Sequence, residues 1–155
     1  LDRLGSLILN PDATIEMDLQ PLLVPDSLAI VKGRIVGGNL ATMNHMIGTG
    51  FLPDLTDNIL FIEEVNEAAY RIDRMISQMK MASLFNNVRA VVTGSFEKCH
   101  PDSMIAEILT DTFNGTGVPV FSGLDCGHGR INHPIPLGVD VLIDPQRKKI
   151  VFNAA

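Results

Sequence analysis

A glutamate at the end of an apolar run is the first residue whose position suits chemistry. Glu63 directly follows the run Ile59–Ile62, where a strand covered on both faces is expected to give way to a loop. In α/β sheets, ligand-binding and catalytic groups collect at the carboxyl ends of the strands. Glu64 and Glu67 follow so closely, however, that one of the three acids need only lead into the next helix. Position alone therefore favours a solvated or capping acid.

A histidine between two glycines is the second such residue. His128 lies between Gly127 and Gly129, which let the backbone turn sharply and leave the imidazole clear of its neighbours. That setting suits a general base, although a loop histidine is more often simply exposed or hydrogen-bonded. A strand-end carboxylate and a loop histidine make two thirds of a Ser-His-acid arrangement, whose third member is a hydroxyl on a sharp turn.

The chain contains no Gly-x-Ser-x-Gly sequence, the usual setting of a nucleophilic serine in α/β hydrolases. Ser95 is the best local candidate because it follows a strand and Gly94. The next residues, 96–98, include no small residue and no helix start, so an oxyanion hole is not expected there. We predict that Ser95 is structural and that the nucleophilic serine is absent from this chain.

Cysteine and histidine clusters offer a zinc site as the alternative chemistry. The candidate ligands are Cys99, His100, Cys126, His128 and His133. Neither cluster has the usual gap of two to four residues between paired cysteines, and a proline directly follows two of the histidines. Zinc therefore ranks as a minor alternative, and we expect neither a metal nor another cofactor.

Strands and helices that alternate only through the middle of the chain must position these residues. The clearest helix, residues 67–83, has apolar side chains at helical spacing and a favourable Glu67–Arg71 pair. Asn39 is the predicted N-cap of a short helix between residues 40 and 47. A further helix begins near residue 103, and strands are predicted at residues 28–36, 58–63, 88–93, 118–121, 137–143 and 149–152.

These elements predict a single α/β domain over residues 28–155. Its sheet is expected to be mixed, with antiparallel late strands, and its helices come from the middle of the chain. Gly37 and Gly38 are expected to break the first strand. Residues 1–27 contain two turn-forming Pro-Asp segments and are predicted to be a connector that includes at most one strand. Because the chain begins at Leu1 rather than at a methionine, we expect it to be part of a longer protein.

Charge and composition narrow the possible partners. The 155 residues carry a formal net charge of -6 and no run of lysine or arginine, so no electrostatic footprint for nucleic acid or an anionic membrane surface is present. The two cysteines are too few for a disulfide framework. Small molecules or proteins are the expected partners.

Several short segments follow one another in a characteristic order along the chain. They are Gly37-Gly38-Asn39-Leu40, Ile47-Gly48-Thr49, Ile59-Leu60-Phe61-Ile62-Glu63-Glu64, Tyr70-Arg71-Ile72-Asp73-Arg74-Met75, Gly94-Ser95-Phe96, Gly127-His128-Gly129 and Pro136-Leu137-Gly138. Taken together in this order, they resemble the LD-carboxypeptidases, peptidase family S66. The resemblance covers about residues 30–145, and the ordered set is specific although no single segment is.

The resemblance implies a three-layer swivelling β/β/α fold and a catalytic role for two residues. In this family a serine of an N-terminal domain attacks the amide, and a glutamate and a histidine of the C-terminal domain complete the triad. These map to Glu63 and His128, while Asn39 maps to the region that binds substrate. The implied reaction releases the terminal D-alanine from an L,D-linked murein tetrapeptide, commonly in the cytoplasm during wall recycling.

The resemblance leaves several alternatives open. A related branch, the microcin immunity peptidases, cleaves an acyl-aspartyl nucleotide, although the Gly127–Asn132 segment favours the murein enzymes by analogy. A non-catalytic module that binds muropeptide or mediates dimerisation also fits the chain. The expected partners are accordingly a murein peptide, an N-terminal domain of the same protein and a second copy of the chain.

Overall fold

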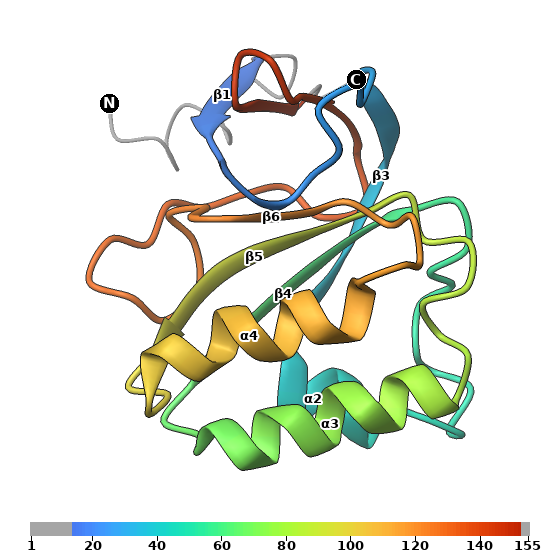
Figure 1. Ribbon diagram of the computed structural model, residues 1–155, viewed down its shortest axis with the longest axis vertical. Coiled ribbons are helices and arrows are strands. Elements are labelled where there is room, and N and C mark those ends of the chain that lie inside the picture. Colours follow the sequence, from blue (N-terminus) through green and yellow to red (C-terminus); the bar gives the residue numbers. More distant parts are fainter. Residues whose placement is uncertain (1–13, 153–155) are drawn as a thin grey trace.

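The described part of the chain folds into three layers, two of sheet and one of helix. The structure is a computed structural model that describes residues 14–152. One eight-stranded mixed sheet has the order β1-β8-β7-β3-β4-β5-β6-β2. It bends so that an antiparallel layer covers one face of a parallel layer, and the helices cover the other face (Figure 1). The predicted α/β class, mixed sheet and β/β/α layering are confirmed.

Parallel strands form the middle layer. They are β3 (Val31–Asn39), β4 (Ile59–Val65), β5 (Ala90–Glu97) and β6 (Val120–Ser122), paired in that order. Helices α2 (Leu40–His45), α3 (Ala69–Met81) and α4 (Asp102–Phe113) connect successive strands of this layer. In β4, six of seven residues are buried, which is why its first four residues form a continuous apolar run. None of the helices in residues 14–152 is long and apolar enough to cross a bilayer.

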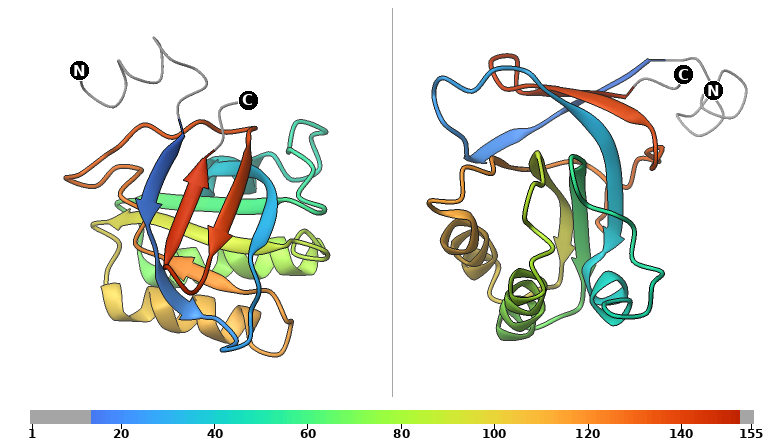
Figure 2. Two further views of the ribbon diagram at one scale, coloured as in Figure 1. Left: turned by 90° about the horizontal axis from the view of Figure 1, so that it is seen from above. Right: turned by 90° about the vertical axis from the view of Figure 1, so that its right-hand side faces the viewer.

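Antiparallel strands form the outer layer. Strand β7 (Asp140–Asp144) pairs with β3, β8 (Lys149–Phe152) pairs with β7, and β1 (Ile15–Asp18) pairs with β8. Strand β2 (Gln20–Leu23) pairs with β6 at the other end of the strand order. Because β1 and β2 are separated by one residue, Leu19, the same segment forms both ends of the sheet and nearly closes it (Figure 2).

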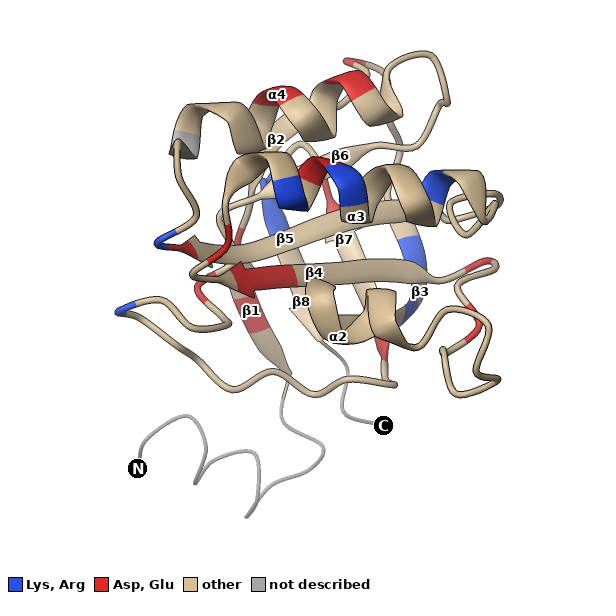
Figure 3. Cartoon of the chain, turned by 90° about the horizontal axis from the view of Figure 1, so that it is seen from below, with Lys and Arg blue, Asp and Glu red and all other residues tan. Residues whose placement is uncertain are grey.

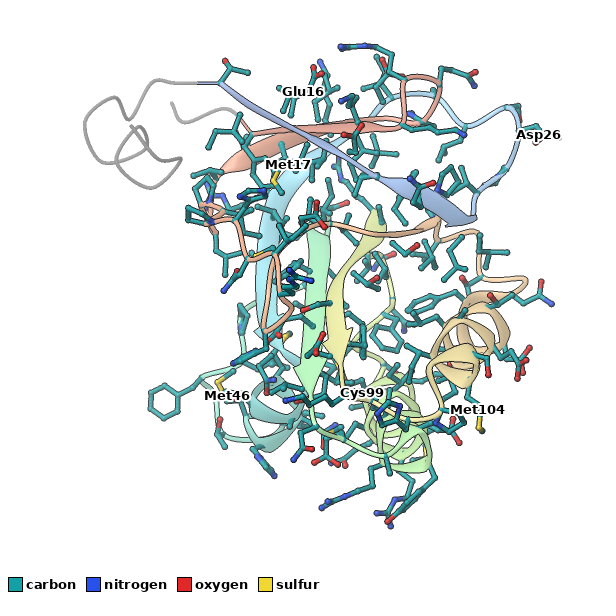
Figure 4. All side chains as sticks on the ribbon, turned by 90° about the vertical axis from the view of Figure 1, so that its left-hand side faces the viewer. Glu16, Met17, Asp26, Met46, Cys99 and Met104 are labelled. Carbon is teal, nitrogen blue, oxygen red and sulfur yellow. The ribbon has the colours of Figure 1, made fainter. Side chains whose placement is uncertain are left out.

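The N-terminal segment contributes two strands to the sheet. Residues 1–27 were predicted to be a connector with at most one strand, whereas both β1 and β2 belong to the sheet, so ordered structure begins before residue 28. Ile15, Met17 and Leu19 are buried between the layers, while Glu16 points outward toward Arg147 (Figure 4). Burial of these side chains contributes roughly 1.5–3 kcal/mol each, enough to hold the segment in place. Residues 1–13 and 153–155 lie outside the described part, and a connecting role for the segment stays a prediction.

Alternate side chains of the parallel strands enter two separate cores. Residues on one face pack with the helices, and residues on the other face pack with the antiparallel layer. In β4, Leu60 and Ile62 face the helices, whereas Ile59 and Phe61 face β1, β7 and β8. This alternation continues beyond Ile62, and it therefore sends Glu63 and Glu64 to opposite faces of the sheet.

The junction between β3 and α2 differs in one respect from the prediction. Asn39 is the N-cap of α2, as predicted, and its Oδ1 accepts a hydrogen bond from the Thr42 amide at 3.0 Å. Gly37 and Gly38 do not break the strand, because β3 continues through them to Asn39. Gly37 has φ +139°, and a Cβ there would collide with the Phe61 carbonyl, so glycine permits the close pairing of β3 with β4.

Candidate active site

Glu63 and His128 meet at the carboxyl end of the parallel layer. His128 Nδ1 lies 2.7 Å from Glu63 Oε2, although the two residues are 65 positions apart. The Glu63 side chain, at the end of β4, is 6% exposed, whereas the His128 side chain, in the loop between β6 and β7, is 55% exposed. The expected approach of these two side chains is confirmed. Their catalytic role stays a prediction.

The contact fixes which imidazole nitrogen is available for chemistry. An ionised carboxylate only accepts hydrogen bonds, so Nδ1 donates to Glu63 and Nε2 is left to accept a proton. The hydrogen bond and the charge of Glu63 raise the pKa of His128 above its ordinary value, with a smaller contribution from the charge of Glu64. Desolvation lowers the pKa but does not outweigh these effects. Acidic residues lie at this end of β4 (Figure 3).

Glycines let the histidine loop rest against the strand ends. Gly127 has φ +116°, and a Cβ there would lie 2.7 Å from Glu63 Oε2 and 2.8 Å from Ser95 Oγ. A Cβ on Gly94 would collide with the Cys126 carbonyl. Since no side chain larger than hydrogen fits at either position, the loop can approach closely enough for His128 to reach Glu63.

Ser95 lies within strand β5 rather than on a turn after it, which corrects the predicted end of that strand. Its Oγ accepts a hydrogen bond from the Gly129 amide at 2.9 Å. This contact with the histidine loop agrees with the structural role predicted for Ser95. The residues around Ser95 do not predict its hydrogen bond with Gly129, because Gly129 lies 34 positions later in the chain.

Asn39 and Glu64 form a second polar cluster beside the pair. Asn39 is the cross-strand neighbour of Glu63, and its Nδ2 donates to Glu64 Oε1 at 2.8 Å. The buried Glu64 also accepts hydrogen bonds from the Ala41 amide at 2.8 Å and the Val65 amide at 2.9 Å. The cluster ties the start of α2 to the end of β4. Sequence reasoning missed Glu64, which it treated only as an acid leading into a helix.

The proposed zinc ligands are not brought together. Cys99 belongs to the core under the helices (Figure 4) and Cys126 to the core between the sheet layers, on opposite faces of the parallel strands. Burial and the nearby charge of Glu63 outweigh a backbone hydrogen bond and raise the pKa of Cys126 to about 11, which disfavours a thiolate ligand. Within residues 14–152, no three histidine, cysteine or acidic side chains form a group that could hold a metal ion.

Known proteins share both the sequence and the fold. Residues 32–143 match the family described as the LD-carboxypeptidase C-terminal domain. The chain is 35% identical over 124 residues to the Escherichia coli microcin C7 self-immunity protein MccF, covering 77% of this chain and 36% of that protein. It is 30% identical over 155 residues to a Bacillus subtilis protein named "Probable murein peptide carboxypeptidase", covering 96% and 48% respectively.

Solved structures agree with these matches. A muramoyltetrapeptide carboxypeptidase from Oxalobacter formigenes superimposes with a TM-score of 0.79 at 26% identity, covering 97% of this chain and 52% of that one. A structure of MccF in complex with glutamyl sulfamoyl guanosine gives a TM-score of 0.75 at 29% identity, covering 87% and 40%. The chain thus spans about a third to a half of the length of these relatives. With residues 32–143 matching the family model and the fold shared, the chain belongs to the LD-carboxypeptidases of peptidase family S66, as their C-terminal domain.

Proposed function

We propose that this chain supplies the general base and its orienting acid to a serine carboxypeptidase that removes the terminal D-alanine from L,D-linked murein tetrapeptides. The observation that carries the proposal is the 2.7 Å contact between His128 Nδ1 and Glu63 Oε2. A base that must take and return one proton needs a fixed tautomer and a nearby negative charge, and Glu63 provides both.

The roles follow from the two imidazole nitrogens. Nε2 of His128 takes the proton of a serine hydroxyl as its oxygen attacks the carbonyl carbon of the scissile amide. The resulting imidazolium is stabilised by Glu63 through Nδ1. Nε2 then gives the proton to the amine of D-alanine as the C–N bond breaks, which leaves the peptide as an ester on the serine. Water activated by the same nitrogen hydrolyses that ester.

The serine is proposed to come from the N-terminal domain that the family resemblance implies. Ser95 is an unsuitable nucleophile because its Oγ accepts a hydrogen bond from Gly129 and its strand does not lead into a helix at a sharp turn. We therefore expect the chain alone to fold, since it has two separate apolar cores, yet to lack useful peptidase activity.

Asn39 is the residue proposed to contact the substrate. It lies beside Glu63 across the β3–β4 pair, and its amide nitrogen has two hydrogens, of which one is directed to Glu64. The second is proposed to donate to a carbonyl or carboxylate of the peptide. The relatives named as murein peptide and muramoyltetrapeptide carboxypeptidases support this substrate class. The proposed setting is the cytoplasmic turnover of wall peptides.

The test is a D-alanine release assay on an L,D-tetrapeptide. The proteins compared are the longer protein with both domains, this chain alone, and the longer protein carrying His128→Ala or Glu63→Gln. We expect activity in the longer protein, none in the chain alone, and a loss of roughly 10³-fold or more for His128→Ala. His133→Ala is the matched control, because it removes another imidazole from the same loop.

Two results would redirect the proposal. Hydrolysis of an aminoacyl sulfamoyl nucleotide in place of the tetrapeptide would assign the chain to the MccF branch, one of whose solved structures holds glutamyl sulfamoyl guanosine. Muropeptide binding without hydrolysis of either substrate would favour a binding or dimerisation module. Full activity of His128→Ala would refute the proposed role of the histidine.

A further inference from the structure

Strand β5 has an irregularity directly beside Glu63. Ile62 pairs with Thr93 and Glu64 pairs with Phe96, so two residues of β5, Gly94 and Ser95, stand opposite the single residue Glu63. Such β-bulges are rare between parallel strands and occur preferentially next to functional sites, where they redirect side chains. Here the bulge interrupts the β4–β5 register and turns Ser95 toward the histidine loop.

Ser95 holds the histidine loop at two points, one on each side of His128. Before the histidine, the Ser95 amide donates to the Cys126 carbonyl at 2.9 Å. After it, the Gly129 amide donates to Ser95 Oγ at 2.9 Å. One residue of β5 therefore fixes both ends of the segment that contains His128.

The fit between Ser95 and the loop leaves little room. A Cβ on Gly129 would lie 3.0 Å from Ser95 Cβ and 3.2 Å from its Oγ, and a Cβ on Gly127 would lie 2.8 Å from that Oγ. The imidazole itself is 55% exposed, so side-chain packing does little to orient it. The backbone around it must therefore be held by other contacts, and Ser95 supplies two of them.

We infer that Ser95 is a positioning residue, which holds the Gly127–Gly129 backbone so that His128 Nδ1 stays on Glu63. The inference rests on the proposed function for its catalytic meaning, but the positioning itself is a property of this chain. Removal of the hydroxyl leaves the Gly129 amide without its acceptor, and the glycine-flanked loop then gains conformations in which the imidazole is turned away from Glu63.

The experiment is NMR on this chain in three forms: wild type, Ser95→Ala and Glu63→Gln. The titration of His128 and the exchange of the Gly129 amide are followed in each. We expect Ser95→Ala to speed Gly129 exchange and to move the pKa of His128 downward, in the same direction as Glu63→Gln but less far. Glu63 and Glu64 of β4, whose charges act on His128, remain in place in Ser95→Ala.

A matched control separates positioning from general loss of stability. Ser122→Ala removes another hydroxyl of the same sheet, whose Oγ donates to the Gln20 carbonyl at 3.4 Å, away from the loop. It is expected to leave the His128 titration unchanged. A Ser95→Ala protein that melts at a lower temperature but keeps the wild-type pKa of His128 and slow Gly129 exchange would overturn the inference.

A second variant covers the case in which Ser95→Ala does not fold. Gly129→Ala places a methyl group against Ser95 and so disturbs the same contact from the histidine loop. The same downward shift of the pKa of His128 is expected. If Glu63→Gln lowers the pKa of His128 while Ser95→Ala and Gly129→Ala do not, Ser95 does not position the histidine, although Glu63 and His128 still interact. If Glu63→Gln has no effect on that pKa, the proposed interaction of Glu63 with His128 fails, and the inference fails with it. In the longer protein, Ser95→Ala is expected to lower kcat roughly 10- to 100-fold with little change in KM.

Discussion

Substitution of Gly127 by alanine is the sharpest perturbation of the histidine loop. The new methyl group would lie 2.7 Å from Glu63 Oε2 and 3.1 Å from Glu63 Cβ, and φ at this residue is +116°. Backbone strain at such a φ costs about 1–3 kcal/mol. Overpacking against the carboxylate adds about 1–3 kcal/mol. The native loop position thus becomes less favourable by about 2–6 kcal/mol.

A displaced loop avoids this strain but gives up native contacts. Displacement breaks the two hydrogen bonds between Ser95 and the loop, worth about 0.5–1.5 kcal/mol each, and also the contact between His128 and Glu63. With that contact added to the roughly 1–3 kcal/mol of the two hydrogen bonds, the displaced position costs about as much as the strained one, so a fraction of the molecules is expected to hold His128 away from Glu63. The predicted result is a loss of about 2–6 kcal/mol in the free energy of unfolding, together with a lower pKa of His128.

Gly115→Ala is the matched control. Gly115 has φ +73°, yet a Cβ there meets no atom within 4 Å, so it isolates the backbone cost of about 1–2 kcal/mol. Urea denaturation and NMR titration of His128 are measured for both variants. The reasoning is refuted if Gly127→Ala keeps the wild-type pKa of His128 and loses no more stability than Gly115→Ala.

Four further outcomes are expected. The folded-state pKa of His128 is raised, so the stability that its contact with Glu63 contributes is fully present below the unfolded value of about 6.5 and disappears as pH rises through the folded value. In urea denaturation, Glu63→Gln is therefore expected to lose more free energy of unfolding at about pH 5.5 than at about pH 8.5. Glu64→Ala removes the acceptor of three hydrogen bonds and is expected to cost about 2–5 kcal/mol by the same measurement, whereas Glu67→Ala, which removes a partly exposed ion pair, costs about 1 kcal/mol or less. Cys126 is expected to resist alkylation at neutral pH until the chain unfolds. Purified protein is expected to hold no stoichiometric zinc, and about one equivalent of zinc by elemental analysis would favour a zinc site over the proposed peptidase site.

The strands and helices in the middle of the chain could be predicted because the local pattern of apolar residues reflects which side chains are buried. Strand β4 is covered on both faces and its first four residues are apolar, and α3 buries Ile72, Ile76 and Met79 at helical spacing. The end of β4 also located Glu63, and the flanking glycines located His128. Their contact followed from the requirement that a general base be oriented, rather than from any pattern that links positions so far apart.

The second closing strand and the loop contacts were missed for a different reason. Ile15, Met17 and Leu19 alternate with polar residues, a pattern typical of a strand, but each strand there has four residues and the neighbouring prolines indicated turns. Ser95 was predicted to be structural, but its contact with the histidine loop was not predicted. Its role depends on a bulge and on a loop that folds back from much later in the chain, and neither leaves a local signal.

The pH dependence of kcat/KM, measured on the longer protein beside the NMR titration of His128, tests the central claim most directly. A general base must be neutral to act, so activity is lost as pH falls through the pKa of His128. We predict that the acidic limb of the profile coincides with that pKa, above the ordinary value for histidine, and that both move to lower pH in Glu63→Gln. An acidic limb that stays in place while the pKa of His128 falls would contradict the account.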